Sequence, residues 1–258
     1  MSGGFYNQAD LQPPKSRSWL HAEPDALAEE KMADLTTLYA HAPALLAAGE
    51  RGLSTDAMPG SQALERKHPT RLLEPGQEER RAFAYLRRGT LPLSAHGAVA
   101  PGMVVAPSLG PTRTAEDVVT HITRTVTGDD EATRWHFVLD HLNIHQAASL
   151  VRLVAEHEGL EEDLGQKGTR GMLRAMVTRA AFLSDPTHTL VCHYPPKHAA
   201  WRHQIERWCS IVVRKLLKRA SCTSVEDWRA RGLALVQYFN ATRAQPFQWT
   251  YGQKPLYG

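Results

Sequence analysis

Hydrophobic and polar positions in the first part of the chain predict one helix and a few short strands. Residues 24–41 are good helix formers with apolar side chains at helical spacing, so we expect a helix that stops before Pro43. Residues 52–56 form a weak strand candidate. Residues 90–106 predict a β-hairpin in which Gly102 precedes a β-rich run. This part therefore mixes a helix with strands that turn back on one another.

The rest of the chain alternates strand and helix, which is typical of a parallel sheet. Thr114 and Asp117 have capping-box spacing ahead of an amphipathic helix. Strands are predicted over residues 135–140 and 189–194, and the helix after the first of them ends at Gly159. The pattern predicts an α/β fold with a mixed sheet covered by helices.

Two helices complete this pattern. A long one is predicted over residues 199–219, because five apolar side chains recur there at spacings of 4, 3, 4 and 4 residues: Trp201, Ile205, Trp208, Val212 and Leu216. The last helix opens at Thr223 or Ser224 and runs to Asn240.

Three carboxylates stand where this arrangement can bring them together. Asp140 ends one predicted strand and Asp56 ends another, at the sheet edge where α/β folds bind ligands. Glu206 lies off the centre of the apolar stripe of the long helix, so its side chain can approach the same edge. If the two strands are neighbours, we expect Asp56, Asp140 and Glu206 to form one cluster.

Such a cluster favours a metal ion. Two carboxylates about 4 Å apart repel by roughly 4 kcal/mol at an effective dielectric constant near 20. That repulsion corresponds to about three pKa units, so a metal-free cluster would tend to hold a proton. Mg²⁺ prefers oxygen ligands, and two such ions suit chemistry at a phosphodiester.

Each acid also has an ordinary structural explanation. An aspartate at the end of a strand is commonly a turn or cap residue. Arg202, four residues before Glu206, is placed to form a simple helical ion pair with it. The spacing of the acids therefore does not decide the function by itself.

The sequence around the acids resembles a known family. Residues 54–66, 139–145 and 196–211 resemble, in order, the three catalytic blocks of insertion-sequence transposases in the bacterial branch of the mariner superfamily. Residues 164–171 resemble an insertion found in one subgroup of that family. The similarity extends from about residue 16 to residue 256, nearly the whole chain.

The resemblance implies a fold, an activity and a site. The fold is the RNase H-like fold of retroviral integrases, with a mixed five-stranded sheet flanked by helices. The activity is metal-dependent DNA strand cleavage and transfer during transposition, with two Mg²⁺ or Mn²⁺ ions. Asp56, Asp140 and Glu206 fall on the catalytic, metal-binding acids. Asn143 and His145 belong to the second block, where they order the turn or contact DNA, or else cap the helix.

The chain departs from the family pattern at several positions. Ala57 stands where relatives usually have a second acid, His141 where an amide is more common, and Arg202-His203 where a Leu-Asn pair is usual. No helix-turn-helix module precedes the catalytic blocks, so we expect one half of a split transposase or a truncated copy. A catalytically silent DNA-binding or assembly remnant is the alternative function, and an RNA-cleaving nuclease is a third.

The resemblance and the predicted elements also suggest domain boundaries and partners. We expect an N-terminal extension over residues 1–49, a catalytic domain over residues 50–222 with an insertion at 159–187, and a C-terminal helix and tail over residues 223–258. The expected partners are DNA, as transposon ends and target, and a separate helix-turn-helix subunit. A homodimer assembled on DNA is also expected, in the cytoplasm at the nucleoid.

The net charge of +3 is modest, so DNA binding depends on where the basic residues gather. Two groups are candidates for contacts to phosphates, which supply affinity without sequence readout. They are Arg80, Arg81, Arg87 and Arg88, which flank aromatic residues, and Lys197, His198, Arg207, Arg214 and Lys218, on or near the Glu206 helix. A solvated helix face explains part of the second group equally well.

Other chemistries are disfavoured by the sequence. The three cysteines have no CxxC spacing, which is typical of a reducing compartment and not of a zinc–thiolate site. His141 and His145 lie four residues apart, but Leu142 follows where the HExxH motif needs a glutamate. Ser54 and Ser61 have no convincing His-Asp partners for serine hydrolysis. No apolar run has the length of a membrane span.

Overall fold

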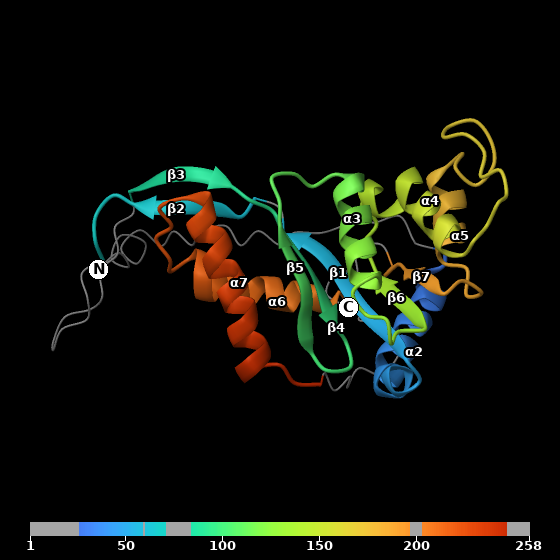
Figure 1. Ribbon diagram of the computed structural model, residues 1–258, viewed down its shortest axis with the longest axis horizontal. Helices are drawn as coiled ribbons and strands as arrows, with labels where there is room; N and C mark the ends of the chain where they lie inside the picture. Colours follow the sequence, from blue (N-terminus) through green and yellow to red (C-terminus); the bar gives the residue numbers. More distant parts are fainter. Residues whose placement is uncertain (1–25, 59, 71–83, 197–202, 247–258) are drawn as a thin grey trace, which may run out of the picture.

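The computed structural model describes residues 26–58, 60–70, 84–196 and 203–246 (Figure 1). The strands of the described residues are β1 Glu50–Met58, β2 Gln62–Arg66, β3 Tyr85–Thr90, β4 Leu93–Ala98, β5 Met103–Leu109, β6 Arg134–Val138 and β7 Leu190–His193. The α-helices are α2 Ala28–Ala47, α3 Ala115–Val126, α4 Ala148–His157, α5 Met176–Leu183, α6 Gln204–Val212 and α7 Val225–Thr242. A 3₁₀ turn η1 (Asn143–Gln146) precedes α4, and a π-helical turn η3 (Val213–Leu217) continues α6.

The main sheet has five strands in the order β5-β4-β1-β6-β7. Strands β1, β6 and β7 are parallel, whereas β4 runs antiparallel to β1 and forms a hairpin with β5. This mixed sheet with helices on both faces confirms the predicted RNase H-like α/β fold class. A second sheet pairs β2 with β3 beside α7, and the sequence pattern did not predict it (Figure 1).

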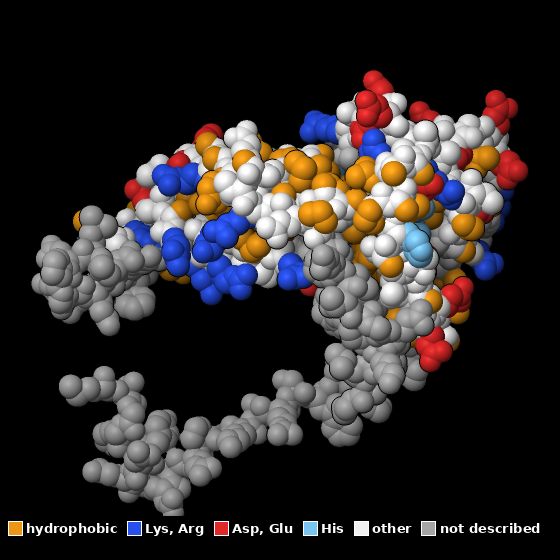
Figure 2. Space-filling model, turned by 90° about the horizontal axis from the view of Figure 1, so that it is seen from below, with side chains coloured by type: hydrophobic (Ala, Val, Ile, Leu, Met, Phe, Trp, Pro, Cys, Tyr) orange, Lys and Arg blue, Asp and Glu red, His pale blue; other side chains and the backbone are white. Residues whose placement is uncertain are grey.

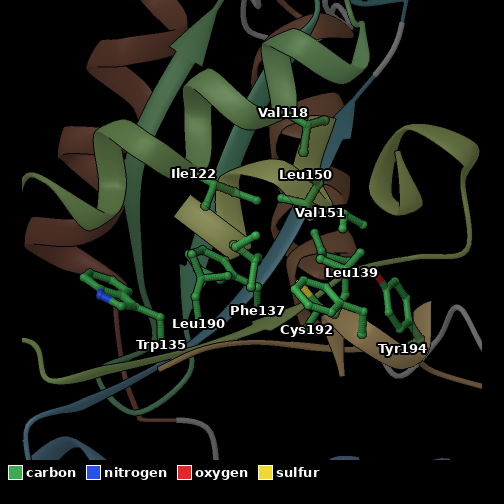
Figure 3. Packing of buried hydrophobic residues seen from close by; sticks show 14 of the residues in the cluster. Val118, Ile122, Trp135, Phe137, Leu139, Leu150, Val151, Leu190, Cys192 and Tyr194 are labelled. Atoms are coloured by element: carbon green, nitrogen blue, oxygen red, sulfur yellow. The ribbon is translucent and has the colours of Figure 1, made fainter. Parts of the chain in front are cut away.

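One face of the main sheet is covered by α3, α4 and α5. Phe137 and Leu139 project from β6 and the residues after it, and Cys192 projects from β7, into a cluster with Ile122 and Leu150 of the helices (Figure 3). All five side chains are fully or almost fully buried. Because Phe137 and Leu139 are buried on this face, they fix the strand that leads directly to Asp140.

The opposite face is covered by α2, α6 and α7. Leu35 and Tyr39 of α2 pack on Val138 of β6. Two tryptophans, Trp208 of α6 and Trp228 of α7, form a separate cluster with residues of β4 and β5. Helices α2, α6 and α7 therefore lie on the same face of the sheet.

Several local predictions are confirmed. The hairpin forms, with Gly102 at a φ of 67° in its turn, a conformation that favours glycine. Thr114 and Asp117 form the predicted capping box of α3. Ser224 is the N-cap of α7, its hydroxyl accepting the Asp227 N–H. These elements are specified by a turn glycine or by helix-capping residues, which can be recognised in the sequence.

Other local predictions are wrong. Helix α2 does not stop before Pro43 but continues to Ala47, since packing of its C-terminal half offsets the hydrogen bond that proline cannot donate. Helix α6 begins at Gln204 rather than at residue 199, and it becomes π-helical at Val213. Residue Trp201 of the predicted stripe lies outside the described residues.

The remaining boundaries differ in detail. The 52–56 strand is the longer β1, so Asp56 lies inside a strand and not at its end. Helix α5 occupies part of the predicted insertion at 159–187, where no helix was expected. The division into residues 1–49, 50–222 and 223–258 stays a prediction. None of the helices in the described part of the chain is long and apolar enough to span a membrane.

Candidate metal centre

The sheet register aligns Asp56 with Asp140. Parallel pairing between β1 and β6 runs from Glu50 opposite Arg134 to Ser54 opposite Val138. Continuing the same register by two residues puts Asp56 level with Asp140. Residues at equal positions on adjacent parallel strands project to the same face about 5 Å apart. The two acids therefore share the face that α6 covers.

Helix α6 is attached to this face through its first turn. The Ile205 N–H donates to the Ser54 hydroxyl at 3.1 Å, and His203 donates from Nε2 to the Val138 carbonyl at 3.0 Å. The helix has no side-chain cap of its own, so Ser54 supplies the missing acceptor from the neighbouring strand. Ile205 packs directly over Gly97 of β4, where a Cβ would be in van der Waals contact with Ile205 Cδ1 at 3.4 Å. These contacts set the position of Glu206, the next residue.

Removing the Ser54 hydroxyl should loosen this attachment. We expect Ser54→Ala to lower the free energy of unfolding by about 1 kcal/mol, as for the loss of a helix N-cap. The matched control is Ser210→Ala, whose exposed hydroxyl bonds only to the Glu206 carbonyl within α6. Urea denaturation of both variants checks the prediction, and an equal effect of the two substitutions would contradict it.

Three potential metal ligands meet at this point. Ligand atoms of Asp56, His203 and Glu206 all lie within 4.8 Å of one another, and no other described residues form such a group of three. Asp56 and Glu206 are half-buried, whereas His203 is 1% exposed. Asp140 is not a member of this group, but it lies close enough for its charge to act on both acids. Two predicted acids are thus brought together, with the third beside them.

The electrostatics of the three acids differ. Burial raises the pKa of Asp56, and the Asp140 charge adds to this, against the opposing effects of His203 and the Ala57 N–H. Burial, then the charges of Asp56 and Asp140, raise the pKa of Glu206. For His203, burial lowers the pKa despite the nearby acids. The cluster is therefore an unfavourable place for two bare negative charges, which a bound cation would relieve.

Asp140 is held by its own turn. Burial acts to raise its pKa, but hydrogen bonding from His145 Nδ1 and from the Leu142 N–H keeps the pKa of Asp140 below its usual value. His145 is 1% exposed, and its carbonyl accepts the hydroxyl of buried Tyr194. This carboxylate is thus kept ionised and fixed in orientation.

These contacts bear on the two second-block residues. His145 forms a hydrogen bond through Nδ1 with the Asp140 carboxylate. Asn143 is exposed, and the N-cap of α4 is Ala147, so neither residue caps that helix. His141 donates from Nε2 to the Pro195 carbonyl.

Only some of the basic residues predicted to contact phosphates lie in the described part of the chain. Arg87 and Arg88 are exposed on β3, and Arg88 forms an ion pair with Glu65. Arg207, Arg214 and Lys218 are spaced 7 and 4 residues apart in the sequence. Arg214 lies in the π-helical turn and Lys218 is its C-cap, so the three do not share one regular α-helical face. Arg80, Arg81, Lys197 and His198 lie outside the described residues. Figure 2 shows Lys and Arg side chains gathered toward the left end of the face that it displays.

Sequence reasoning gave His203 no role in the site. The sequence does show that His203 departs from the family pattern, because relatives usually have asparagine at this position, just before the catalytic glutamate. What the sequence did not show is that the N-terminus of α6 turns this side chain inward, onto Val138 and toward Asp56.

The chain is similar in sequence to one known family and in structure to several solved proteins. The family described as DDE superfamily endonuclease matches residues 59–229, a span that includes Asp140 and Glu206 and begins just after Asp56. No curated protein matches the sequence. Among solved structures, the Mos1 transposase paired-end complex with left transposon end is 12% identical with a TM-score of 0.33, covering 92% of this chain and 66% of that chain. A pre-cleavage Mos1 transpososome is 14% identical with a TM-score of 0.38, covering 93% and 63%. The chain thus spans less than two thirds of the length of these two proteins.

Proposed function

This chain belongs to the DDE superfamily of endonucleases, and on that premise we propose that it is the catalytic part of an insertion-sequence transposase of the mariner superfamily's bacterial branch. Its reaction is metal-dependent cleavage of DNA strands and their transfer to a target. The observation that carries the proposal is the meeting of Asp56 and Glu206 within 4.8 Å, with Asp140 aligned beside Asp56.

The donors of this site fit a hard divalent cation, because carboxylate oxygens that repel one another are the ligands that Mg²⁺ and Mn²⁺ prefer. We assign Asp56, Asp140 and Glu206 to hold two such ions. Held by these residues, such ions would supply activation of the attacking water or 3′-hydroxyl and charge stabilisation at the leaving oxygen of the phosphodiester. His145 orients Asp140 and keeps its carboxylate ionised, ready to bind.

DNA is the proposed substrate and partner. Arg87, Arg88, Arg207, Arg214 and Lys218 are exposed and can bind phosphates on the surface that flanks α6 and β3. Arg80, Arg81, Lys197 and His198 belong to the same proposal, although they lie outside the described residues. A separate helix-turn-helix chain would recognise the transposon ends, and a homodimer would form on them, at the nucleoid.

A nicking assay on supercoiled plasmid DNA tests the function. We expect the chain to convert the plasmid to open circles with Mg²⁺ or Mn²⁺, and to lose this activity in EDTA. An equimolar RNA–DNA hybrid should be cleaved more slowly than duplex DNA.

The control is Asp163→Asn, which removes an exposed acid paired with Arg170, far along the chain from the cluster. It should nick at the wild-type rate. Preference for the hybrid would replace the transposase with an RNA-cleaving nuclease. Binding of metal and DNA without any nicking would make the chain a silent remnant.

A further inference from the structure

One ring nitrogen of His203 is buried without a partner. The Val138 carbonyl can only accept a hydrogen bond, so the 3.0 Å contact makes Nε2 the protonated nitrogen of the neutral ring. Nδ1 then carries a lone pair, and it is inaccessible to solvent and has no hydrogen-bond partner. A buried acceptor left unpaired is costly and calls for an explanation.

The side chains around His203 explain why this nitrogen has no protein partner. His203 lies with Asp56 and Glu206 in the cluster whose ligand atoms are all within 4.8 Å of one another. Both neighbours are acceptors when ionised and cannot donate a hydrogen bond to Nδ1. A cation between the three side chains would satisfy all of them at once.

The second contact of the ring is the one that metal-binding histidines usually have. Such residues donate their other N–H to a carboxylate or backbone carbonyl, which fixes the tautomer and the orientation of the ring. In this chain the Val138 carbonyl takes that role, at the last residue of β6 and two residues before Asp140. The ring is thus held in a fixed orientation beside the acids.

We propose that His203 is a nitrogen ligand of a divalent ion bound by Asp56 and Glu206, and that it shifts the preference of the site from Mg²⁺ toward Mn²⁺ and other first-row transition ions. The proposal rests on the function above, in which these acids bind metal. Imidazole is a good ligand for transition ions, whereas Mg²⁺ favours oxygen and keeps its waters. The specificity therefore follows from one donor atom of this chain.

Pulsed electron paramagnetic resonance of Mn²⁺ bound to the full chain tests this directly. Protein made with ordinary histidine should show coupling of the ion to ¹⁴N, and protein made with ¹⁵N-histidine should show ¹⁵N coupling instead. This comparison needs no substitution, so it does not depend on the folding of a variant.

Two variants identify the residue. His203→Asn should abolish the histidine coupling and weaken Mn²⁺ binding by about tenfold or more, with a smaller change for Mg²⁺, measured by calorimetry. His157→Asn, in an exposed residue at the end of α4, should change neither. Circular dichroism melts confirm that both variants are folded.

The outcomes separate this proposal from the function itself. Bound Mn²⁺ without histidine coupling, or coupling that persists in His203→Asn, overturns the proposal while nicking of DNA still supports the transposase. No Mn²⁺ binding by the wild-type chain overturns both.

Discussion

Asp56→Asn is expected to reduce metal-dependent nicking of plasmid DNA by at least about 10³-fold. The substitution removes a ligand and a negative charge from the cluster with Glu206, and metal ions contribute several kcal/mol of charge stabilisation to such reactions. Each 1.36 kcal/mol corresponds to about a tenfold change in rate. Rates with saturating Mn²⁺, compared with wild type and Asp163→Asn, provide the measurement.

The same substitution should stabilise the metal-free protein. In the fold, Asp56 is half-buried beside Glu206 and Asp140, and its amide replacement removes the repulsion. Each kcal/mol of relieved repulsion raises Tm by roughly 2–4 °C in a chain of this size. Activity and stability are thus expected to change in opposite directions, which a simple folding defect would not produce.

The pH dependence of this stabilisation has a definite sign. Because burial raises the pKa of Asp56 above its ordinary value of 3.8, the folded protein holds that proton more tightly than the unfolded chain does. Its contribution to stability is present at low pH and is lost as pH rises from about 3.8 through the raised pKa. In EDTA, the Tm difference between Asp56→Asn and wild type should therefore grow with rising pH. A difference that is constant, or that shrinks, would contradict the account.

Phe137→Ala is expected to lower the free energy of unfolding by about 3–5 kcal/mol. Phe137 is 0% exposed in the centre of β6, with its ring centroid 5.4 Å from that of His96 and 6.0 Å from that of Trp135 (Figure 3). Truncation leaves a cavity under the strand that leads to Asp140. Since domains are usually stable by only about 5–15 kcal/mol, the variant should be close to unfolding.

Urea denaturation is the measurement for this substitution. The control is Val177→Ala, because Val177 is 79% exposed on α5 and should change stability by less than about 0.5 kcal/mol. A loss below about 1 kcal/mol for Phe137→Ala would show that β6 is not the centre of the core.

Elements with a strong local signal could be predicted from the sequence. Strand β6 is a short apolar run that ends close to Asp140, and α3 and α7 begin at capping residues that the structure confirms. The mixed sheet followed from the alternation of strands and helices. The three acids were placed by resemblance, and the sheet register then aligned two of them.

Features that depend on tertiary contacts could not be predicted. The helical spacing of apolar residues continues past Val213, so it gives no sign of the π-helical turn there. Pro43 predicts the end of a helix, but packing of α2 carries the helix past it. The pairing of β2 with β3 joins segments separated by a long connection, so it leaves no local pattern. His203 resembled an ordinary substitution because its role depends on Val138 and Asp56, both distant in the chain.

An anomalous-scattering crystallographic map of the protein with Mn²⁺ shows directly where the ion binds. We expect manganese density in contact with carboxylate oxygens of Asp56 and Glu206 and bordered by Asp140. Manganese bound elsewhere on the molecule, with these three side chains making only protein contacts at saturating Mn²⁺, would contradict it.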